Sequence, residues 1–374
     1  MKRLSDISLS RKLAFSCAAV VLAWVLVEIE LLVWGWVASG ESGPQFPLLY
    51  QAHPYRAYAP VPNRVDRARE ARFNSFGLRG PEIALQKPPN TIRVVCLGGS
   101  TTFGNSASSN TRTYPARMER LLREHYREAP FRIEVINAGV GFYSSLESLI
   151  DFETRLLDLS PGVAVVHHGI NDGWFMLPRG DFRSDYSHAR RTFGPPTRKW
   201  WLYSPLLSRL FGRQLGTNLY VPNPNPSLVS MIFTPPDIAD RVNRRPRSQL
   251  EPPMVAAFER NLRNFISVAR ANGIIPVLST QSFIDDTSAG GHWIGAVRRL
   301  NAVTLDVAVR ESVDAIDFAR FLPWNPDDYD DVCHLKDTPG GLGRQAEIFA
   351  RRLIEGRVLE RAWEQQPARS GKKR

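Results

Sequence analysis

The stretch from Arg93 to Thr102, RVVCLGGSTT, constrains the fold of this chain more than any other segment. Its valine, cysteine and leucine side chains do not alternate with polar ones, which is typical of a strand covered on both faces in a parallel α/β sheet. Gly98, Gly99 and Ser100 follow that strand directly. Because such sheets carry their ligand sites at the carboxyl ends of the strands, we expect Ser100 at a functional site.

Two later segments place further reactive side chains after apolar runs or in loops. The apolar run at 163–168 is followed by Asn171 and Asp172, and near the carboxyl end Asp331 stands three residues before His334. A serine hydroxyl is a weak nucleophile unless a base takes its proton. His334 is the candidate base, and Asp331 is the group that would orient it and stabilise the imidazolium.

In this order the three segments resemble the SGNH, or GDSL-like, hydrolase family over residues 91–357. The esterase elbow Gly-x-Ser-x-Gly is not matched, since Thr102 stands where its second glycine is required. The resemblance implies ester hydrolysis through an acyl-serine intermediate, with Ser100, His334 and Asp331 as the catalytic residues and no metal or organic cofactor.

The resemblance also implies an oxyanion hole. In the family its donors are the amide of the nucleophile, a glycine amide of the second motif block and the asparagine of Gly-x-Asn-Asp, which here correspond to Ser100, Gly141 and Asn171. The chain departs from the family at the second donor, because aligning 137–139 leaves Phe142 where the glycine is usual. Either Gly141 serves with a shift of one residue or Phe142 donates its own amide.

Each of these residues also has a structural explanation. Ser100 fits a turn, Asn171 fits a helix cap, and Asp331 with His334 fits a surface pair at a helix start. We expect catalysis because the whole set occurs together and in the order of the family.

Strand-like and helix-like patterns alternate from residue 92 onward, which predicts an α/β fold. We expect a three-layer α/β/α sandwich with a parallel, doubly wound, flavodoxin-like sheet. The predicted strands are 93–98, 131–136, 163–166, 274–278 and 313–317, and the predicted helices are 113–122, 145–158, 254–272, 294–312 and one from 338.

The domain organisation follows from the same patterns. We predict a cytoplasmic stub and membrane anchor at 1–40, a connecting and flanking segment at 41–90, the hydrolase domain at 91–357 and a basic tail at 358–374. An insertion at 174–253 interrupts the hydrolase domain. Within it, the aromatic and apolar stretch Lys199–Phe211 fits a lid, a membrane-facing element or a helix packed on the core.

Lys2, Arg3, Arg11 and Lys12 precede an apolar stretch, Leu13–Ala38, that is long enough to cross a bilayer as a helix. The positive flank predicts that the amino end stays in the cytoplasm and that a single-pass anchor holds the catalytic domain on the other side.

The same stretch carries features that need a special environment. Because carboxylates are costly in a bilayer, Glu28 and Glu30 should lie near the outer interface or face a partner helix. A cleaved signal peptide is the alternative to an anchor, with the small residues at 37–39 as the cleavage site. Either alternative exports the catalytic domain.

The net charge of +11 is uneven, with eight basic residues against two acids between Arg179 and Arg213. This stretch favours anionic headgroups, acidic glycans or simply a solvated surface over nucleic acid, for which there is no recognition motif. Cys17, Cys96 and Cys333 do not form a disulfide framework, and no metal-ligand spacing is present.

Together these patterns predict an exported serine esterase, anchored in the cytoplasmic membrane, that acts on O-acetyl groups of an envelope or extracellular polysaccharide. An O-acyltransferase with the same triad is the first alternative. A lipolytic esterase with a lid at Trp200–Phe211 is the second, and a non-catalytic glycan-binding protein on the same fold is the third. The acylated carbohydrate, or a small ester, and the membrane are the expected partners.

Overall fold

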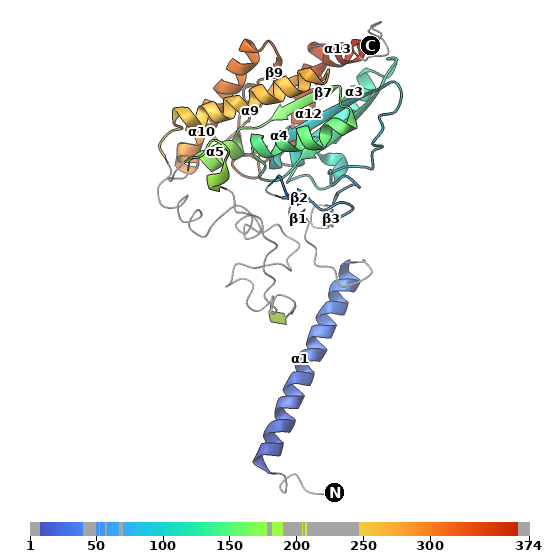
Figure 1. Ribbon diagram of the computed structural model, residues 1–374, viewed down its shortest axis with the longest axis vertical. Coiled ribbons are helices and arrows are strands. Elements are labelled where there is room, and N and C mark those ends of the chain that lie inside the picture. Colours follow the sequence, from blue (N-terminus) through green and yellow to red (C-terminus); the bar gives the residue numbers. More distant parts are fainter. Residues whose placement is uncertain are drawn as a thin grey trace. The chain divides into compact units, whose positions relative to one another are not determined.

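The computed structural model describes residues 8–39, 50–51, 53–56, 58–66, 70–177, 182–189, 204, 206–207 and 247–365 (Figure 1). It divides into two compact units, one formed by Met1–Leu48 with Gly194–Val229 and the other by Leu49–Phe193 with Ser230–Arg374. Most of the predicted insertion, including all but three residues of Lys199–Phe211, lies outside the described residues, so its proposed role as a lid stays a prediction.

The first unit contains one long helix, α1 (Leu9–Ser39). Among the described residues it is the helix long and apolar enough to cross a membrane, and its composition fits a membrane span and a signal sequence equally. The carboxylate of Glu28 accepts hydrogen bonds from the indole of Trp24, the hydroxyl of Ser204 and the amide of Leu206. This acid therefore has polar partners inside its own unit.

The second unit is built on a five-stranded parallel sheet in the order β6-β5-β7-β8-β9. The strands are β5 (Thr91–Gly98), β6 (Arg132–Gly139), β7 (Val163–His167), β8 (Ile275–Ser279) and β9 (Asp314–Ile316). Gly98 pairs with Gly139 on one side and His167 on the other, and Ser279 continues the row. The predicted doubly wound parallel sheet is confirmed, and its carboxyl ends form one edge.

Helices cover both faces of this sheet. On one face, α3 (Tyr114–His125), α12 (Arg344–Glu355) and α13 (Val358–Glu364) enclose an apolar core with the buried side chains of β5 and β7. On the other face lie α4 (Ser145–Thr154), α9 (Pro252–Ala271) and α10 (Thr287–Arg310), which appear together in Figure 1. The three-layer sandwich predicted from the alternation of elements is therefore the observed architecture.

Local sequence accounts for several helix ends. Thr113 accepts a hydrogen bond from the amide of Ala116 at the start of α3, where Pro115 occupies the first turn. Ser144 and Glu147 form a capping box at the start of α4. Gly273, with φ of 67°, ends α9 in the left-handed region.

The compact unit continues past residue 357, where the sequence predicted a basic tail. Val358, Leu359, Ala362 and Trp363 are buried and give α13 an apolar face against the core. This spacing of apolar residues is that of an amphipathic helix. The first part of the predicted tail, up to Glu364, is thus a folded helix, and residues after 365 lie outside the described ranges.

The flanking segment 41–90 contributes short strands: β1 (Tyr50–Gln51) pairs with β2 (Ala59–Pro60), and β3 (Val65–Asp66) pairs with β4 (Ala71–Arg72). Each pair is antiparallel and only two residues long, so it is held by packing rather than by its own ladder. Phe73, just after β4, stacks on Phe103 with ring centroids 5.9 Å apart, which joins this segment to the residues that follow Ser100.

Candidate active site

Ser100 begins a short helix, α2 (Ser100–Phe103), directly after β5, and its side chain is nearly buried. The two glycines before it are required by close packing. A Cβ on Gly98 would overlap the side chain of Thr102, and a Cβ on Gly99 would overlap the amide of Asn171. The tight turn between strand and helix therefore depends on glycine at both positions.

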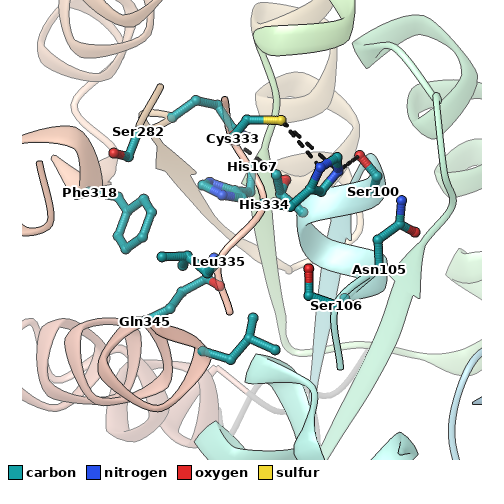
Figure 2. Close-up of a pocket in the computed structure, with 14 residues that line it drawn as sticks. Ser100, Asn105, Ser106, His167, Ser282, Phe318, Cys333, His334, Leu335 and Gln345 are labelled. Atoms are coloured by element: carbon teal, nitrogen blue, oxygen red, sulfur yellow. Dashed lines mark hydrogen bonds between the residues drawn. The ribbon is translucent and has the colours of Figure 1, made fainter. Parts of the chain in front are cut away.

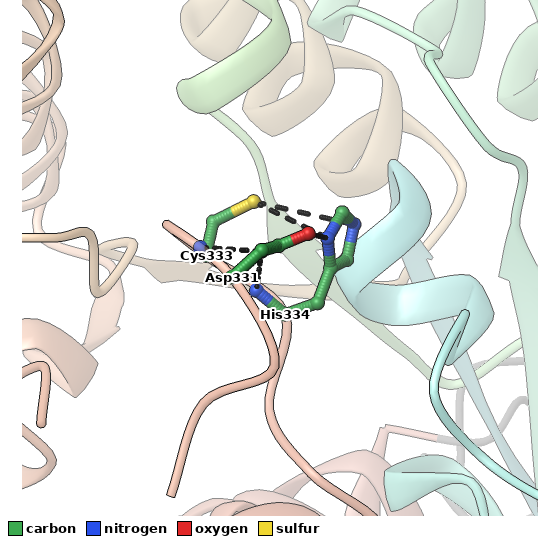
Figure 3. Close-up of side chains that lie close together, drawn as sticks. All are labelled: Asp331, Cys333 and His334. Carbon is green, nitrogen blue, oxygen red and sulfur yellow. Dashed lines mark hydrogen bonds and ion pairs between the residues drawn. The ribbon is translucent and has the colours of Figure 1, made fainter. Parts of the chain in front are cut away.

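The structure brings the predicted base to the predicted nucleophile. Nε2 of His334 lies 2.7 Å from Oγ of Ser100, and Nδ1 lies 2.6 Å from Oδ2 of Asp331 (Figure 2 and Figure 3). These are hydrogen-bond distances, and the two contacts connect the three side chains in series. This is the arrangement in which a histidine can remove the serine proton while a carboxylate holds its tautomer.

The loop that carries this pair is held by its own backbone. The second carboxylate oxygen of Asp331 accepts hydrogen bonds from the amides of Cys333 and His334, at 2.9 and 2.8 Å. The indole of Trp324 donates to the carbonyl of Asp331 at 3.0 Å, and an isolated bridge joins Tyr329 to Leu335. The spacing of three residues thus delivers acid and base on one turn.

Electrostatics favour an ionised Asp331 and a strongly basic His334. Burial tends to raise the pKa of Asp331, but the hydrogen bond and charge of His334 outweigh it and lower the pKa to about 2. Burial tends to lower the pKa of His334, but the neighbouring sulfur of Cys333 and the carboxylate of Asp331 outweigh it and raise the pKa to about 10. The base therefore holds its proton to higher pH than an ordinary histidine.

Asn171, the residue predicted to donate to the oxyanion, lies beside the turn that carries Ser100. It is the second residue of α5 (Ile170–Met176), and its Nδ2 donates to the carbonyl of Tyr143 at 2.8 Å. The same nitrogen packs against Gly99, the residue before the nucleophile. An amide nitrogen carries two protons, so the hydrogen bond to Tyr143 uses one N–H and leaves the second for another acceptor.

The second predicted donor, Gly141, is placed differently. The hydroxyl of Tyr58 donates to its carbonyl, and the hydroxyl of Tyr50 lies 3.8 Å from where a Cβ would stand. Phe142 adopts a positive φ of 61°. The part of this loop that contacts Gly99 is the carbonyl of Tyr143. The structure therefore brings Ser100, His334, Asp331 and Asn171 together. The contacts of Gly141 named above involve its carbonyl and Cα, so the choice between the amides of Gly141 and Phe142 stays a prediction.

Arg79 is a residue of the site that sequence reasoning missed. It is 2% exposed, and its guanidinium donates to the carbonyls of Phe103, Gly104 and Ala107, at 3.1, 2.5 and 3.0 Å. It also lies over the ring of Phe103, 4.8 Å from the centroid. The turn-rich sequence around it, at 74–80, signalled a packed segment but not its partner. Arg79 fixes the backbone that follows Ser100.

A small pocket, open in part to solvent, adjoins the serine and histidine (Figure 2). Its lining is mostly polar or small, and includes Thr101, Asn105, Ser106 and Gln281 beside Ser100. His167, at the end of β7, also lines it and is buried, and burial lowers its pKa to about 3. A histidine with so low a pKa binds a proton weakly, so His167 is a poor general base at ordinary pH.

Asp331, Cys333 and His334 form a cluster that a metal ion could use, with one ligand atom of each within 4.8 Å of the others (Figure 3). Hydrogen bonds account for the closeness of the acid and the histidine, and the thiol of Cys333 lies 3.6 Å from Nδ1 of His334. The cluster therefore belongs to the candidate triad and is explained without an ion.

Comparisons with known proteins agree with this geometry. A model of the GDSL-like lipase/acylhydrolase family matches residues 96–338, well over half of the chain. A search of curated proteins found no match. The family match begins at Cys96 within β5 and includes Ser100 and the loop that holds Asp331 and His334.

Three solved structures are among the structural matches. A putative lipolytic protein from Desulfitobacterium hafniense DCB-2 is 15% identical, with a TM-score of 0.41, covering 70% of this chain and 99% of its own. A lipase/acylhydrolase from Enterococcus faecalis is 15% identical, with a TM-score of 0.41, covering 71% and 96%. A catalytic mutant of an acetylxylan esterase from Geobacillus stearothermophilus is 14% identical, with a TM-score of 0.42, covering 70% and 94%.

The match over 96–338 and the parallel sheet with Ser100 at its carboxyl edge lead to one assignment. This chain belongs to the GDSL-like lipase/acylhydrolase family and is a serine hydrolase of ester bonds.

Proposed function

We propose that this protein removes O-acetyl groups from an envelope or extracellular polysaccharide, with Ser100 as the nucleophile. The observation that carries the proposal is the series of contacts from Ser100 through His334 to Asp331, at 2.7 and 2.6 Å. Ser100 and a distant loop that carries both Asp331 and His334 meet with the geometry that ester cleavage by serine requires.

The reaction takes two half-steps. His334 takes the proton of Ser100 as its oxygen attacks the ester carbonyl, and the tetrahedral oxyanion is held by the amide of Ser100 and the side chain of Asn171. The intermediate collapses as the sugar oxygen leaves with the proton from His334. Water then gives a proton to His334 and attacks the acyl-serine, and acetate leaves as Ser100 recovers its proton.

The pocket supports a short acyl group. Its lining mixes hydroxyl and amide side chains with the apolar Phe318, Leu335 and Leu342, and its space is too small for a long acyl chain. A fatty acyl chain buries most of its surface in an apolar channel, whereas an acetyl group does not need one. We therefore expect acetyl esters to be cleaved much faster than long-chain esters.

The proposed location rests on the amino end. Basic residues precede the apolar helix α1, which favours a cytoplasmic amino terminus and a catalytic unit outside the cytoplasm. A protease added to spheroplasts should digest the catalytic unit without lysis, and full protection of that unit would refute the location.

The function is tested with the full-length protein in detergent, using p-nitrophenyl acetate and p-nitrophenyl palmitate. We expect turnover of the acetate, loss of at least about 10⁴-fold in kcat for Ser100→Ala, and labelling of Ser100 by a serine-reactive phosphonate. Ser109→Ala is the matched control, because Ser109 lies in the following loop and bonds to Thr111 rather than to His334.

With an acetylated glycan as donor and a second glycan present, free acetate should be the product. If the acetyl group were instead transferred mainly to the second glycan, the activity would be acyl transfer and not hydrolysis. An active Ser100→Ala variant would refute the nucleophile.

A further inference from the structure

One face of α5 combines the candidate oxyanion donor with an exposed tryptophan. Asn171 and Trp174 are three residues apart, so they are neighbours on the helix surface. Trp174 is 41% exposed, whereas Asp172 and Phe175, on the opposite side of the same turns, are buried. A large indole therefore faces outward one turn away from the proposed reaction centre.

Trp174 is paired with a second indole from a distant segment. Trp293, near the start of α10, stacks on it with ring centroids 4.6 Å apart and planes inclined by 20°. The neighbouring Gly173 packs against α10, because a Cβ at this glycine would stand 3.5 Å from the Cβ of Ala296. The two helices thus hold the indoles nearly parallel and stacked face to face, as a plate in which Trp293 backs the partly exposed indole of Trp174.

The buried side of α5 keeps this plate in position. The carboxylate of Asp172 accepts hydrogen bonds from the hydroxyl of Tyr186 at 2.9 Å and from the amide and hydroxyl of Ser145. The ring of His188 contacts the carbonyl of Phe175 at 3.0 Å. A binding surface whose backbone is already fixed loses less entropy when a ligand binds.

We propose that the plate formed by Trp174 and Trp293 is a subsite for a sugar ring of the polysaccharide whose ester is cleaved at Ser100. This inference rests on the proposed function. The C–H face of a pyranose ring packs against a flat indole, and the ring hydroxyls remain in water. Three helical residues span about 4.5 Å, close to the length of one sugar ring, so a ring on Trp174 lies next to the ester-bearing residue held at Asn171.

An exposed tryptophan pair also fits a membrane surface, since indoles are enriched at bilayer interfaces. A sugar ring of the substrate and a membrane surface place different geometric demands on the tryptophan pair. The oxyanion donor on the same helix face favours the substrate, because a membrane does not need to be aligned with the reacting ester. Binding of the tryptophan pair to lipid in place of the substrate would overturn the proposal.

The test compares a polymeric and a small substrate of the full-length enzyme. The probes are chemically O-acetylated hexasaccharides of xylose, glucose and N-acetylglucosamine, with p-nitrophenyl acetate as the small ester. For Trp174→Ala we expect the ratio of kcat/KM on the best hexasaccharide to kcat/KM on the small ester to fall about tenfold, mainly through a higher KM. Trp174→Phe should recover much of the ratio, and Trp293→Ala should give an intermediate fall.

Tyr55→Ala is the matched control, because Tyr55 is an exposed aromatic residue of the flanking segment. Its ratio should match the wild type. An unchanged ratio in Trp174→Ala for all three hexasaccharides overturns the subsite, as does a loss of binding to phosphatidylglycerol vesicles without a change in the ratio. Absence of Ser100-dependent turnover of the small ester would instead refute the proposed function, so the two failures are distinguishable.

Discussion

The two sides of the active site are held in place in different ways. On the nucleophile side, Ser100 follows a central strand, and Arg79 fixes the backbone after it from a segment more than twenty residues earlier. On the acid-base side, Asp331 and His334 sit on one loop whose hydrogen bonds are almost all internal. The nucleophile therefore depends on long-range packing, whereas the acid and base depend on local sequence.

The largest effect is expected from breaking the hydrogen bond between Ser100 and His334, where the two sides meet. His334→Gln removes the base but keeps a polar side chain of similar size, so kcat should fall by about 10⁴- to 10⁶-fold with a smaller change in KM. Steady-state kinetics on p-nitrophenyl acetate measure this. A loss below a hundredfold would mean that another group accepts the proton.

A smaller loss is expected at the donor beside the nucleophile. Asn171→Ala removes the amide that is anchored on Tyr143, and loss of one oxyanion donor costs about 10²- to 10³-fold in kcat. Because the donor acts mainly in the transition state, KM should change little. A variant that loses affinity but keeps kcat would show that Asn171 binds the substrate instead.

The long-range support of the nucleophile is tested at Arg79. Arg79→Met leaves three buried carbonyls without their donor, so unfolding should become easier by at least about 2 kcal/mol and kcat should drop. Urea unfolding followed by near-ultraviolet circular dichroism measures the difference. Arg127→Met is the control, since Arg127 is a mostly exposed surface arginine and its loss should cost less than about 0.5 kcal/mol.

The smallest effect is expected inside the acid-base loop, as a shift in pH dependence. A general base works in its neutral form, so activity should rise with pH as His334 loses its proton, and its raised pKa places that rise above the usual histidine range. Burial lowers the pKa of His334, while Cys333 and Asp331 raise it, so Cys333→Ala should move the rise to lower pH. Profiles of kcat/KM from pH 5 to 10 measure the shift. A rise in activity at the same pH in Cys333→Ala and the wild type would show that the sulfur does not raise the pKa of His334.

The sequence could predict what local patterns encode. The uninterrupted apolar run before Gly98 located the central strand, and the alternation of strand and helix predicted the sheet and its layers. The short spacing between Asp331 and His334 likewise predicted that one loop carries both residues. The catalytic roles of these residues remain predictions, supported by the distances that the structure shows.

Contacts between distant segments could not be predicted from a single sequence. Nothing in the turn-rich stretch around Arg79 indicates that its guanidinium meets carbonyls after Ser100, and nothing links Trp174 to Trp293. The second oxyanion donor stays a prediction for a related reason, because the position of the loop that holds Gly141 and Phe142 depends on how Tyr58 of the flanking segment packs against it. The spacing of apolar residues in α13 is that of an amphipathic helix, but the basic residues after it favoured the prediction of a tail.

The placement of acid and base on one short loop has a consequence for how the enzyme loses activity. A displacement of that loop carries Asp331 and His334 together, so their own hydrogen bond survives while the contact with Ser100 is broken. The site therefore consists of two parts that meet at the hydrogen bond between Ser100 and His334. Mild heat or denaturant should therefore abolish activity in one step when this loop moves away from Ser100. This loss should come before the parallel sheet unfolds.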